Sequence, residues 1–323
     1  MNRHKSDLKR VPSILRAGTR ASRLALVQTR STLNHLKEIF GNIAFEEVPI
    51  STPGDRDRLA DLKTSPPDFF TRDLDEAIMS GRIDCAIHSA KDMPDPVPEG
   101  LDWFWLPWRE DPRDVIVLPA GRNIAGLPEK ARIGVSSERR ETWCLKRFPG
   151  AQFCSIRGTI EERLGLLDGG SYDMVIMAGA ALIRLGLEDR ISEWIPEEEL
   201  PPPDGQGYLA ITFKSGDERF LRMRSLFVKS VVFTGGGAGS ADTFTLGGMK
   251  ALQRCDVCIY DSLMDQAILQ HVPAHSLRVD VGKRCGSHSM LQAGISGLIT
   301  IYARRGLRVV RLKGGDPGIF GRL

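Results

Sequence analysis

Apolar and polar positions along this chain repeatedly switch between the two-residue period of a strand and the longer period of a helix. In residues 83–88 (IDCAIH) every second position is a large apolar residue, which predicts a short buried strand. Just before it, Phe70, Leu74 and Ile78 recur at a spacing of four and predict a helix that ends at Gly81. Alternating strands and helices indicate an α/β fold with helices packed on sheets.

The same reasoning places the remaining elements. Strands are predicted at residues 14–17, 45–50, 132–135, 231–234, 255–260 and 309–312, within DMVIM at 173–177, and at the end of 200–213. Helices are predicted to begin after Ser22 as N-cap and to cover residues 138–148 and 245–253, with 214–229 as a charged helix or linker. We expect a tight loop at residues 18–20 and a loop of small residues after DMVIM.

One α/β pattern occurs twice. The strand, loop and helix start at residues 132–148 parallel those at 14–28, and residues 169–186 parallel SGRIDCAIHSAKD at 80–92. Two similar lobes are therefore expected, with the loops at their strand ends facing one another across a cleft, where α/β proteins bind ligands. Lys91 and Asp92, which follow the strand at 83–88, should face this cleft.

Composition narrows the classes of partner. Lys and Arg number 44 against 41 Asp and Glu, so there is no net field of the kind that favours nucleic acid or anionic membranes. No apolar run reaches membrane-spanning length, and the basic N-terminus has no apolar segment after it, so we expect a cytoplasmic protein. The six cysteines lack the dense spacing of a disulfide scaffold, and no metal site is predicted. Cys255 and Cys258 form a CxxC, a spacing also found in redox and zinc pairs, but buried packing is favoured here. Cys255 and Cys258 should be buried on opposite faces of a strand.

Charge is concentrated locally, because six arginines fall at predicted strand ends or helix starts on the cleft side. They are Arg20, Arg139, Arg140, Arg157, Arg163 and Arg184. Arg139 and Arg140 would lie in the first turn of a helix, where a cation opposes the helix dipole, so a bound anion rather than a capping role is indicated. Guanidinium forks suit carboxylates and phosphates. The alternative, solvated surface arginines, remains open for any one of them.

Residues 14–213 resemble hydroxymethylbilane synthase, also called porphobilinogen deaminase. GTRASRLAL, HSAKDMP, REDPRD, SSERR, SIRGTIEERL, AGAALIRLG and GQG occur in the order and approximate spacing of that family. The resemblance implies two lobes like those of the type II periplasmic binding proteins. It also implies head-to-tail condensation of four porphobilinogens into hydroxymethylbilane with loss of ammonia.

The resemblance also implies roles for individual residues. Asp92 would be the catalytic carboxylate, stabilising the azafulvene cation and handling pyrrole protons. A second group would bind the carboxylates of substrate and cofactor: Lys63, Arg20, Ser22, Lys91, Ser136, Ser137, Arg139, Arg140, Arg157, Gly158, Arg163 and Arg184. The family's SIRGN asparagine is Thr159 here, and the loop at residues 63–69 lacks the family's glycine-lysine-glycine pattern.

The implied cofactor is dipyrromethane, which the family attaches to a cysteine in a third domain after the GQG strand. This sequence has no segment similar to that domain, and no cysteine stands at the matching position. Three alternatives follow: the cofactor is held noncovalently, it is attached to another cysteine with Cys144 and Cys154 as first candidates, or deaminase activity is impaired.

Residues 230–322 resemble the N-terminal lobe of uroporphyrinogen-III C-methyltransferase, through VVFTGGGAGSADTFTLGGMKAL, DVCIYDSL, VGKRCGSHSM and VVRLKGGDPGIFGR. The implied cofactor is S-adenosylmethionine, at a site remnant formed by Gly235, Gly237, Gly239, Gly314, Gly315 and Asp316. The aspartate that normally closes the glycine loop is Ser240. Because the family's second lobe has no counterpart, we expect little or no methyl transfer from this chain alone.

The predicted organisation follows from both resemblances. It comprises deaminase domain 1 at residues 1–101 and 197–215, domain 2 at 102–196, a linker at 216–229 and a partial α/β methylase lobe at 230–323. The main hypothesis is a hydroxymethylbilane synthase of haem, sirohaem or cobalamin synthesis. It acts on porphobilinogen and linear pyrrole oligomers, with pathway enzymes as further partners and with neither nucleic acid nor membrane. The alternatives are a noncatalytic tetrapyrrole-binding protein and a methyltransferase that needs a missing lobe.

Overall fold

The computed structural model describes residues 14–41, 43–56, 66, 68–237, 241–261, 265–282 and 292–315. The chain divides into two compact units. Unit 1 comprises Met1–Trp103 and Trp108–Asp217, and unit 2 comprises Phe104–Pro107 and Glu218–Leu323. The fold is mixed α/β throughout, as the sequence predicts.

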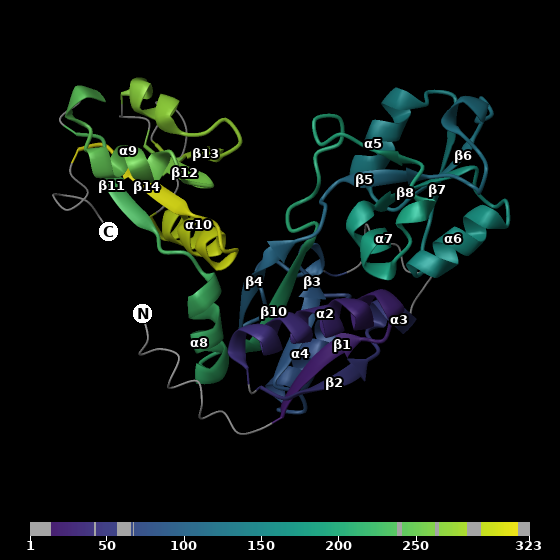
Figure 1. The fold of residues 1–323 in the computed structure, drawn as a ribbon, viewed down its shortest axis with the longest axis horizontal. Coiled ribbons are helices and arrows are strands. Elements are labelled where there is room, and N and C mark those ends of the chain that lie inside the picture. Colours follow the sequence, from purple (N-terminus) through teal and green to yellow (C-terminus); the bar gives the residue numbers. More distant parts are fainter. Residues whose placement is uncertain are drawn as a thin grey trace. The chain divides into compact units, whose positions relative to one another are not determined.

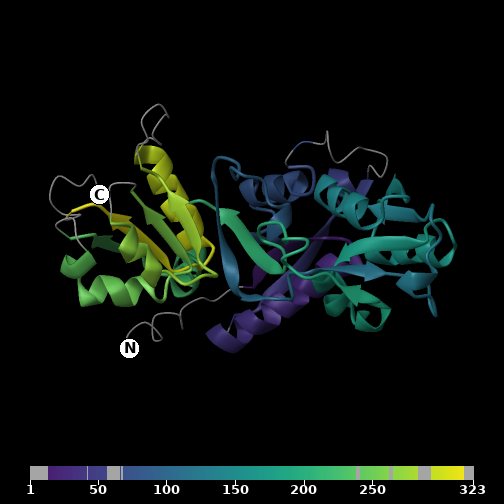
Figure 2. The same ribbon diagram turned by 90° about the horizontal axis from the view of Figure 1, so that it is seen from above.

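Sheet A of unit 1 has the order β2-β1-β3-β10-β4. Its strands are β1 (Leu15–Arg20), β2 (Phe45–Ile50), β3 (Cys85–Ser89), β4 (Leu101–Arg109) and β10 (Tyr208–Lys214). β1 runs parallel to β2 and β3, whereas β10 is antiparallel to β3. Figure 2 shows β10 in green-teal beside the blue β4. The associated helices are α2 (Arg23–Phe40), the short α3 (Pro53–Arg56) and α4 (Arg72–Met79).

Sheet B of unit 1 has the order β7-β6-β8-β5-β9. Its strands are β5 (Asp114–Val117), β6 (Arg132–Val135), β7 (Gln152–Ser155), β8 (Met174–Ala178) and β9 (Glu193–Trp194). The helices that accompany it are α5 (Glu138–Arg147), α6 (Ile160–Asp168) and α7 (Gly179–Leu185), with 3-10 turns η3 (Ile124–Gly126) and η4 (Glu188–Arg190). Figure 1 labels most of these elements.

The two sheets share one design. In sheet A, β1 lies between the parallel strands β2 and β3, and β3 pairs with the antiparallel β10. In sheet B, β6 lies between the parallel strands β7 and β8, and β8 pairs with the antiparallel β5. In each sheet an aspartate just before one strand bonds to the backbone at the start of its parallel neighbour. Asp84, before β3, accepts through Oδ2 from the Arg16 N–H in β1 at 2.8 Å, and Asp173, before β8, accepts through Oδ2 from the Arg132 N–H in β6 at 2.8 Å. Three parallel strands and one antiparallel neighbour are therefore arranged alike in the two sheets.

The core of sheet B explains why its central strand reads as a continuous apolar run. Met174 and Ile176 on β8 pack into one hydrophobic cluster, while Val175 and Met177 pack into another. All four side chains are at most 1% exposed. A strand covered on both faces has no polar side, so periodicity alone does not distinguish it from a buried helix.

Unit 2 contains a parallel sheet of order β11-β14-β12-β13. Its strands are β11 (Val232–Gly235), β12 (Val257–Tyr260), β13 (Leu277–Asp280) and β14 (Val309–Lys313). Its helices are α8 (Glu218–Phe227), α9 (Leu246–Leu252) and α10 (Gln292–Arg304), with 3-10 turns η5 (Ala241–Thr243) and η6 (Gln266–His271). Asp256, just before β12, plays the same part as Asp84 in sheet A: its Oδ2 accepts from the backbone N–H of Arg308, just before the neighbouring β14, at 2.7 Å.

Three sequence predictions about local structure are wrong. Residues 18–20 continue strand β1, where Gly18 leaves room for Ile83: a Cβ on Gly18 would lie 2.3 Å from Ile83 Cδ1. The small residues after β8 form helix α7 instead of a loop. Cys255 and Cys258 are both buried as predicted, but in the same hydrophobic cluster, because Cys255 precedes the strand that begins at Val257.

Within the described part of the chain, no helix is both long enough and apolar enough to cross a membrane.

Candidate functional site

A cavity of about 670 Å³ lies in unit 1 between residues of sheet A and residues of sheet B. Every described residue that the sequence predicts for the deaminase-like site lines it. These are Arg20, Ser22, Lys91, Asp92, Ser136, Ser137, Arg139, Arg140, Arg157, Gly158, Arg163 and Arg184. Lys63 lies outside the described residues. The repeated α/β pattern thus brings together side chains that are far apart in sequence.

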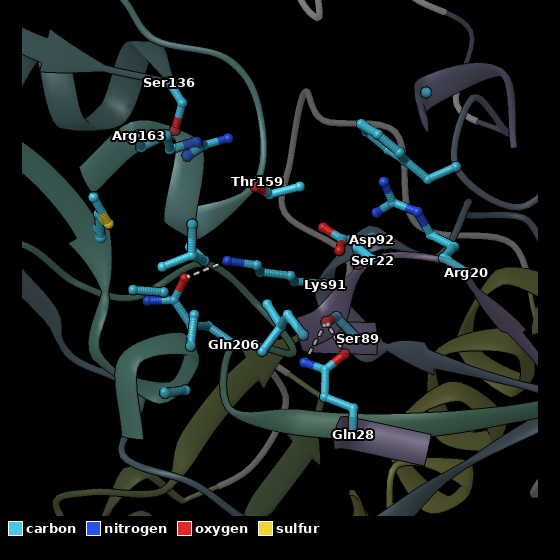
Figure 3. A pocket seen from close by; sticks show the side chains of 18 of the residues that line it. Arg20, Ser22, Gln28, Ser89, Lys91, Asp92, Ser136, Thr159, Arg163 and Gln206 are labelled. Atoms are coloured by element: carbon cyan, nitrogen blue, oxygen red, sulfur yellow. Dashed lines mark hydrogen bonds between the residues drawn. The ribbon is translucent and has the colours of Figure 1, made fainter. Parts of the chain in front are cut away.

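Lys91 and Asp92 enter the cavity from the end of β3, on the 3-10 turn η2 (Ala90–Asp92). In Figure 3 the Lys91 side chain crosses the cavity toward Gln206, and the Asp92 carboxylate points toward the side where Arg163 lies. The loop before β10 packs closely behind this turn. Gly205 has φ +77°, and a Cβ there would lie 2.8 Å from the backbone N of Lys91. A glycine is therefore required for this approach.

The ammonium of Lys91 has an unusual environment. Its Nζ donates to Gln206 Oε1 at 3.0 Å, while the rest of the residue is exposed to the open cavity. Loss of solvent around the ammonium lowers the pKa of Lys91 to about 8; Arg140 and Arg163 also act to lower it, while Asp92 and Asp114 oppose them. Lys91 therefore changes charge close to neutral pH, unlike a solvated lysine.

Asp114, the first residue of β5, organises the arginines at the start of α5. Its carboxylate is fully buried and forms ion pairs with Arg139 and with Arg140, whose Nη2 lies 2.7 Å from Oδ1. Burial by itself would raise the pKa of Asp114, but Arg140 and Arg139 lower it below its usual value. Arg140 also donates to Ser136 Oγ at 2.9 Å. This pair of arginines is held in place before any ligand binds.

Arg157 and Arg163 differ, because neither forms an ion pair with any described residue. Arg163 donates through Nε to the Gly158 carbonyl at 2.9 Å, and Nη1 of Arg157 is buried with no hydrogen-bond partner among the described residues. Burial lowers the pKa of Arg163 to about 10, with Arg140 and Arg157 acting in the same direction. Partly buried cations without an ion-pair partner are costly, so this side of the cavity favours an anionic ligand.

Arg20 and Arg184 are more fully engaged. Arg20 is paired with Asp55 and lies over the Phe70 ring at 4.5 Å. Arg184 donates to the Gly207 carbonyl at 2.6 Å. Burial acts to raise the pKa of Asp55, but its bonds to Arg20 and Thr52 lower the pKa below its usual value. Asp55 therefore stays ionised and balances the charge of Arg20. Arg20 therefore offers less free charge than the sequence suggests, whereas Arg184 is held by a neutral carbonyl and keeps its charge.

Hydroxyl groups cap three helices at the cavity. Ser22 accepts from the Ala25 N–H at the start of α2, Ser137 from Arg140 N–H at α5, and Thr159 from Glu162 N–H at α6. Thr159 and Glu162 form a reciprocal capping box, so the threonine that replaces the family's asparagine stabilises the N-terminus of α6. Gly158, with φ +97°, makes the turn before this cap.

Gln28 and Gln206 line the cavity but were not predicted as site residues, and neither was Asp114, which holds the α5 arginines from outside the lining. Gln28 Nε2 donates to Ser89 Oγ at 3.0 Å, which ties α2 to the end of β3. Asp114 closes the REDPRD motif and Gln206 is the centre of GQG, so both lay within noted motifs. The side-chain partners of Gln206 are 92 to 115 residues away, and the arginine partners of Asp114 are 25 and 26 residues away, which local patterns do not reveal.

The thiols of sheet B do not line the cavity. Cys144 is buried in the hydrophobic cluster of sheet B, where burial raises its pKa to about 12. Cys154 lies on β7, away from the lining residues. Among the described residues no cysteine lines the cavity. The arginines and Lys91 fit the carboxylates of dipyrromethane, but the described lining offers no thiol for a covalent bond.

The glycines of the predicted methylase remnant lie at the ends of β11 and β14. Gly237 forms an isolated bridge with Gly315, and both have positive φ, +77° and +73°. Gly235 ends β11, and Gly314 follows β14. Gly239 and Asp316 lie outside the described residues. The described part brings four of the six predicted residues to neighbouring strand ends.

The fold and cavity define an α/β protein with a cationic cleft, in which Asp92 accepts no hydrogen bond from the described residues, and such a cleft is suited to ligands that carry several carboxylates. The family model described as porphobilinogen deaminase, dipyrromethane cofactor binding domain, matches residues 15–222. The chain belongs to the porphobilinogen deaminase family. A second model, tetrapyrrole (corrin/porphyrin) methylases, matches residues 230–323.

Curated relatives agree with this membership. The porphobilinogen deaminase of Syntrophotalea carbinolica is 41% identical over 212 residues, which cover 65% of this chain and 67% of that protein. That of Geobacter metallireducens is 42% identical over 208 residues, covering 64% and 65% respectively. The chain thus spans about two thirds of the length of these relatives.

Two solved structures are similar at low scores. The native uroporphyrin III C-methyltransferase of Thermus thermophilus is 38% identical over 28% of this chain and 38% of that chain, with a TM-score of 0.25. The periplasmic VFT2 domain of Bordetella pertussis BvgS is 15% identical over 69% of this chain and 89% of that chain, with a TM-score of 0.40. Both TM-scores are too low to bear on function.

Proposed function

We propose that this chain is a hydroxymethylbilane synthase, which joins four porphobilinogens head to tail and releases ammonia at each condensation. The observation that carries the proposal is the cavity itself. Asp92, Lys91, Arg157 and Arg163 all line it, and among the described residues neither of these two arginines forms an ion pair, which supports the proposal. Porphobilinogen carries an acetate and a propionate, so a growing pyrrole chain matches such a set of cations.

The proposed role of Asp92 follows from the charge that develops in the reaction. Loss of ammonia from the aminomethyl group leaves an azafulvene cation, which a nearby carboxylate stabilises. Attack by the next pyrrole forms a carbon–carbon bond, and the displaced ring proton needs an acceptor at the same place. Asp92 lines the cavity and accepts no hydrogen bond from the described residues, which leaves its oxygens available for both tasks.

The cations would divide the binding of carboxylates between them. Arg157, Arg163 and Lys91 have no carboxylate partner in hydrogen-bond contact among the described residues, so they are proposed to bind acetate and propionate groups directly. Arg139 and Arg140 are held by Asp114 and would present a fixed pair of forks. Ser22, Ser136, Ser137, Gly158, Arg20 and Arg184 are proposed to complete the lining.

Dipyrromethane, when bound, would supply the free pyrrole carbon at which chain growth starts. The residues proposed to hold its carboxylates are Arg139, Arg140 and Ser137 on the α5 side. Because the described lining has no cysteine, we propose that these contacts are noncovalent in this chain.

The deciding experiment mixes the purified chain with porphobilinogen and measures ammonia and Ehrlich-positive bilane. Appearance of both supports the proposal, and absence of both contradicts it. Intact mass separates the modes of cofactor binding. A mass increase of dipyrromethane size under denaturing conditions, lost in one Cys→Ser variant, would show a covalent bond and contradict noncovalent binding.

A second candidate is a noncatalytic tetrapyrrole-binding protein, which the lack of a cysteine in the described lining favours. Such a protein would bind linear or cyclic tetrapyrroles in the same cavity without releasing ammonia from porphobilinogen. Tetrapyrrole binding that is unaffected by replacing Asp92 would support this candidate over the enzyme.

The remaining organisation is also proposed. Sheets A and B would be two lobes of the periplasmic-binding-protein type, with domain 1 at residues 1–101 and 197–215 and domain 2 at 102–196, joined by the 216–229 linker to a partial methylase lobe at 230–323. That lobe is proposed to retain part of an S-adenosylmethionine site with little or no methyl transfer. We propose a cytoplasmic enzyme that interacts with other enzymes of tetrapyrrole synthesis.

A further inference from the structure

A chain of hydrogen bonds crosses the cavity from sheet A to sheet B. It starts at Lys91, just after β3, whose Nζ donates to Gln206 Oε1 at 3.0 Å. Gln206 Nε2 in turn donates to Asp114 Oδ1 at 2.9 Å, and Asp114 is the first residue of β5. The amide of one buried glutamine, 1% exposed, therefore links the ammonium to the carboxylate that holds the α5 arginines.

The orientation of the Gln206 amide is determined by its surroundings. Its Nε2 donates to the Pro112 carbonyl at 2.6 Å as well as to Asp114. Both neighbours are acceptors only, so a flipped amide would place its oxygen against two acceptors and lose both bonds. Oε1 is thus the atom that faces Lys91, and the position of the ammonium is fixed by a neutral acceptor.

A neutral acceptor has an electrostatic consequence. The charge of Asp114 is already shared by Arg139 and Arg140, and no carboxylate of a described residue forms an ion pair with Lys91. The charged groups that face Lys91 are Asp92 on its own turn, Asp114 on β5, Arg140 on α5 and Arg163 on α6. Lys91 is therefore held across the cavity while its charge remains available.

We propose that Gln206 and Asp114 are positioning residues, which hold Lys91 in place with its charge available for a substrate carboxylate. They act through Lys91 and the α5 arginines. The inference rests on the proposed function for its substrate, but the positioning itself is testable without turnover.

The first test measures the titration of Lys91 in the full chain by the ¹³Cε chemical shift of labelled lysine, assigned with Lys91→Arg. The wild-type group is expected to titrate at about 8. Gln206→Glu puts a carboxylate in contact with the ammonium, so the pKa should rise by about one unit or more. Gln206→Met keeps the volume but removes the acceptor, so the pKa should fall.

The matched control is Asp111→Asn, which removes an ion pair with Arg113 on the same loop outside the cavity lining. It should leave the Lys91 titration unchanged. An unchanged Lys91 pKa in both Gln206→Glu and Gln206→Met overturns the proposal, whether or not the chain consumes porphobilinogen.

The second test follows kcat and KM for porphobilinogen against pH. Below pH 8, Gln206→Met should raise KM about tenfold with a smaller change in kcat, because a carboxylate contact is weakened while Asp92 is untouched. In Gln206→Glu the alkaline limb of kcat/KM should move upward together with the Lys91 pKa. A loss of kcat alone in Gln206→Met, with KM unchanged, would contradict a role exerted through Lys91.

Discussion

Lys91 and Asp92 are adjacent in sequence but meet different environments. Lys91 spans the cavity to Gln206, and burial lowers its pKa to about 8. Asp92 accepts no hydrogen bond from the described residues and faces the cavity (Figure 3). One residue is thus fixed by its partner, and its neighbour is left for the ligand. Such a division is typical of a site in which one charge binds and the other reacts.

Replacing Asp92 by Asn should separate catalysis from folding. The amide keeps the shape but cannot stabilise a cation or accept a proton, so porphobilinogen turnover should fall by about 10²- to 10⁴-fold. Ammonia release is the measurement, with the thermal midpoint expected to stay unchanged. Asp95→Asn, at an exposed position in the same loop, is the control. An Asp92→Asn chain that keeps half of the wild-type rate would contradict the assigned role.

Asp75 on α4 predicts an unusual response of stability to pH. Its side chain is buried, Oδ2 has no partner among the described residues, and burial raises its pKa to about 6. The folded chain therefore binds this proton more tightly than the unfolded chain, so this group lowers stability as pH rises from about 4 to 6. Asp75→Asn should be more stable than wild type by up to about 2 kcal/mol at pH 7.

Urea unfolding of wild type and Asp75→Asn at pH 4 and pH 7 measures this effect. The difference should be largest at pH 7 and small at pH 4, where the carboxyl is protonated in the folded chain and only about half ionised in the unfolded chain. Asp73→Asn on the same helix removes a partly exposed ion pair with Arg56 and serves as the control. An Asp75→Asn chain that is less stable than wild type at pH 7 would show that the buried carboxylate has a compensating partner.

At the scale of elements, an aspartate that precedes β3 in sheet A, or β8 in sheet B, links that strand to its parallel neighbour. Asp173 accepts from the backbone and side chain of Arg132, at 2.8 and 3.3 Å, and so joins β8 to the start of β6. Asp84 does the same for β3 and β1. These contacts fix the offset between parallel strands and hence the positions at which Lys91 and Arg140 enter the cavity.

Asp173→Asn should lower the free energy of unfolding by about 1–2 kcal/mol, because the charged acceptor of two N–H groups is replaced by a weaker neutral one. Denaturant unfolding followed by tryptophan fluorescence is the measurement. Asp189→Asn, exposed on η4, is expected to change stability by less than about 0.5 kcal/mol. If both variants lose the same free energy of unfolding, the hydrogen bonds of Asp173 to Arg132 contribute nothing beyond a surface charge.

Sequence patterns predicted the elements that local chemistry determines. Ser22 and Ser137 were identified as helix caps because a hydroxyl before an amphipathic run satisfies free backbone N–H groups, and both caps are present. Helix α7 was missed because Gly179, Ala180 and Ala181 show no periodicity, and its helical state depends on packing beneath sheet B. Local signals do not carry that information.

The residues that line the cavity were predictable from motifs, whereas their charge balance was not. The sequence treats the six arginines alike, but the fold pairs Arg20 with Asp55 and Arg140 with Asp114, and leaves Arg157 and Arg163 without a carboxylate partner in hydrogen-bond contact among the described residues. These pairings join residues 35 and 26 positions apart. Which cations remain for a ligand is therefore a property of tertiary structure.

At the scale of the whole molecule, two compact units match two families of tetrapyrrole enzymes. The deaminase match ends at residue 222 and the methylase match begins at residue 230. Every residue that lines the cavity belongs to unit 1. The deaminating chemistry proposed here thus needs no described side chain of unit 2.

Gly315→Val tests this independence. Gly315 has φ +73°, which a β-branched residue strongly disfavours, so the substitution should distort the strand-end loop after β14. Porphobilinogen consumption should stay within about twofold of wild type, because the cavity residues are untouched. Gly247→Ala on α9 is the control, since a Cβ there meets no atom within 4 Å. If deamination is lost in Gly315→Val but kept in Gly247→Ala, unit 2 contributes to the reaction, and the cavity of unit 1 does not act by itself.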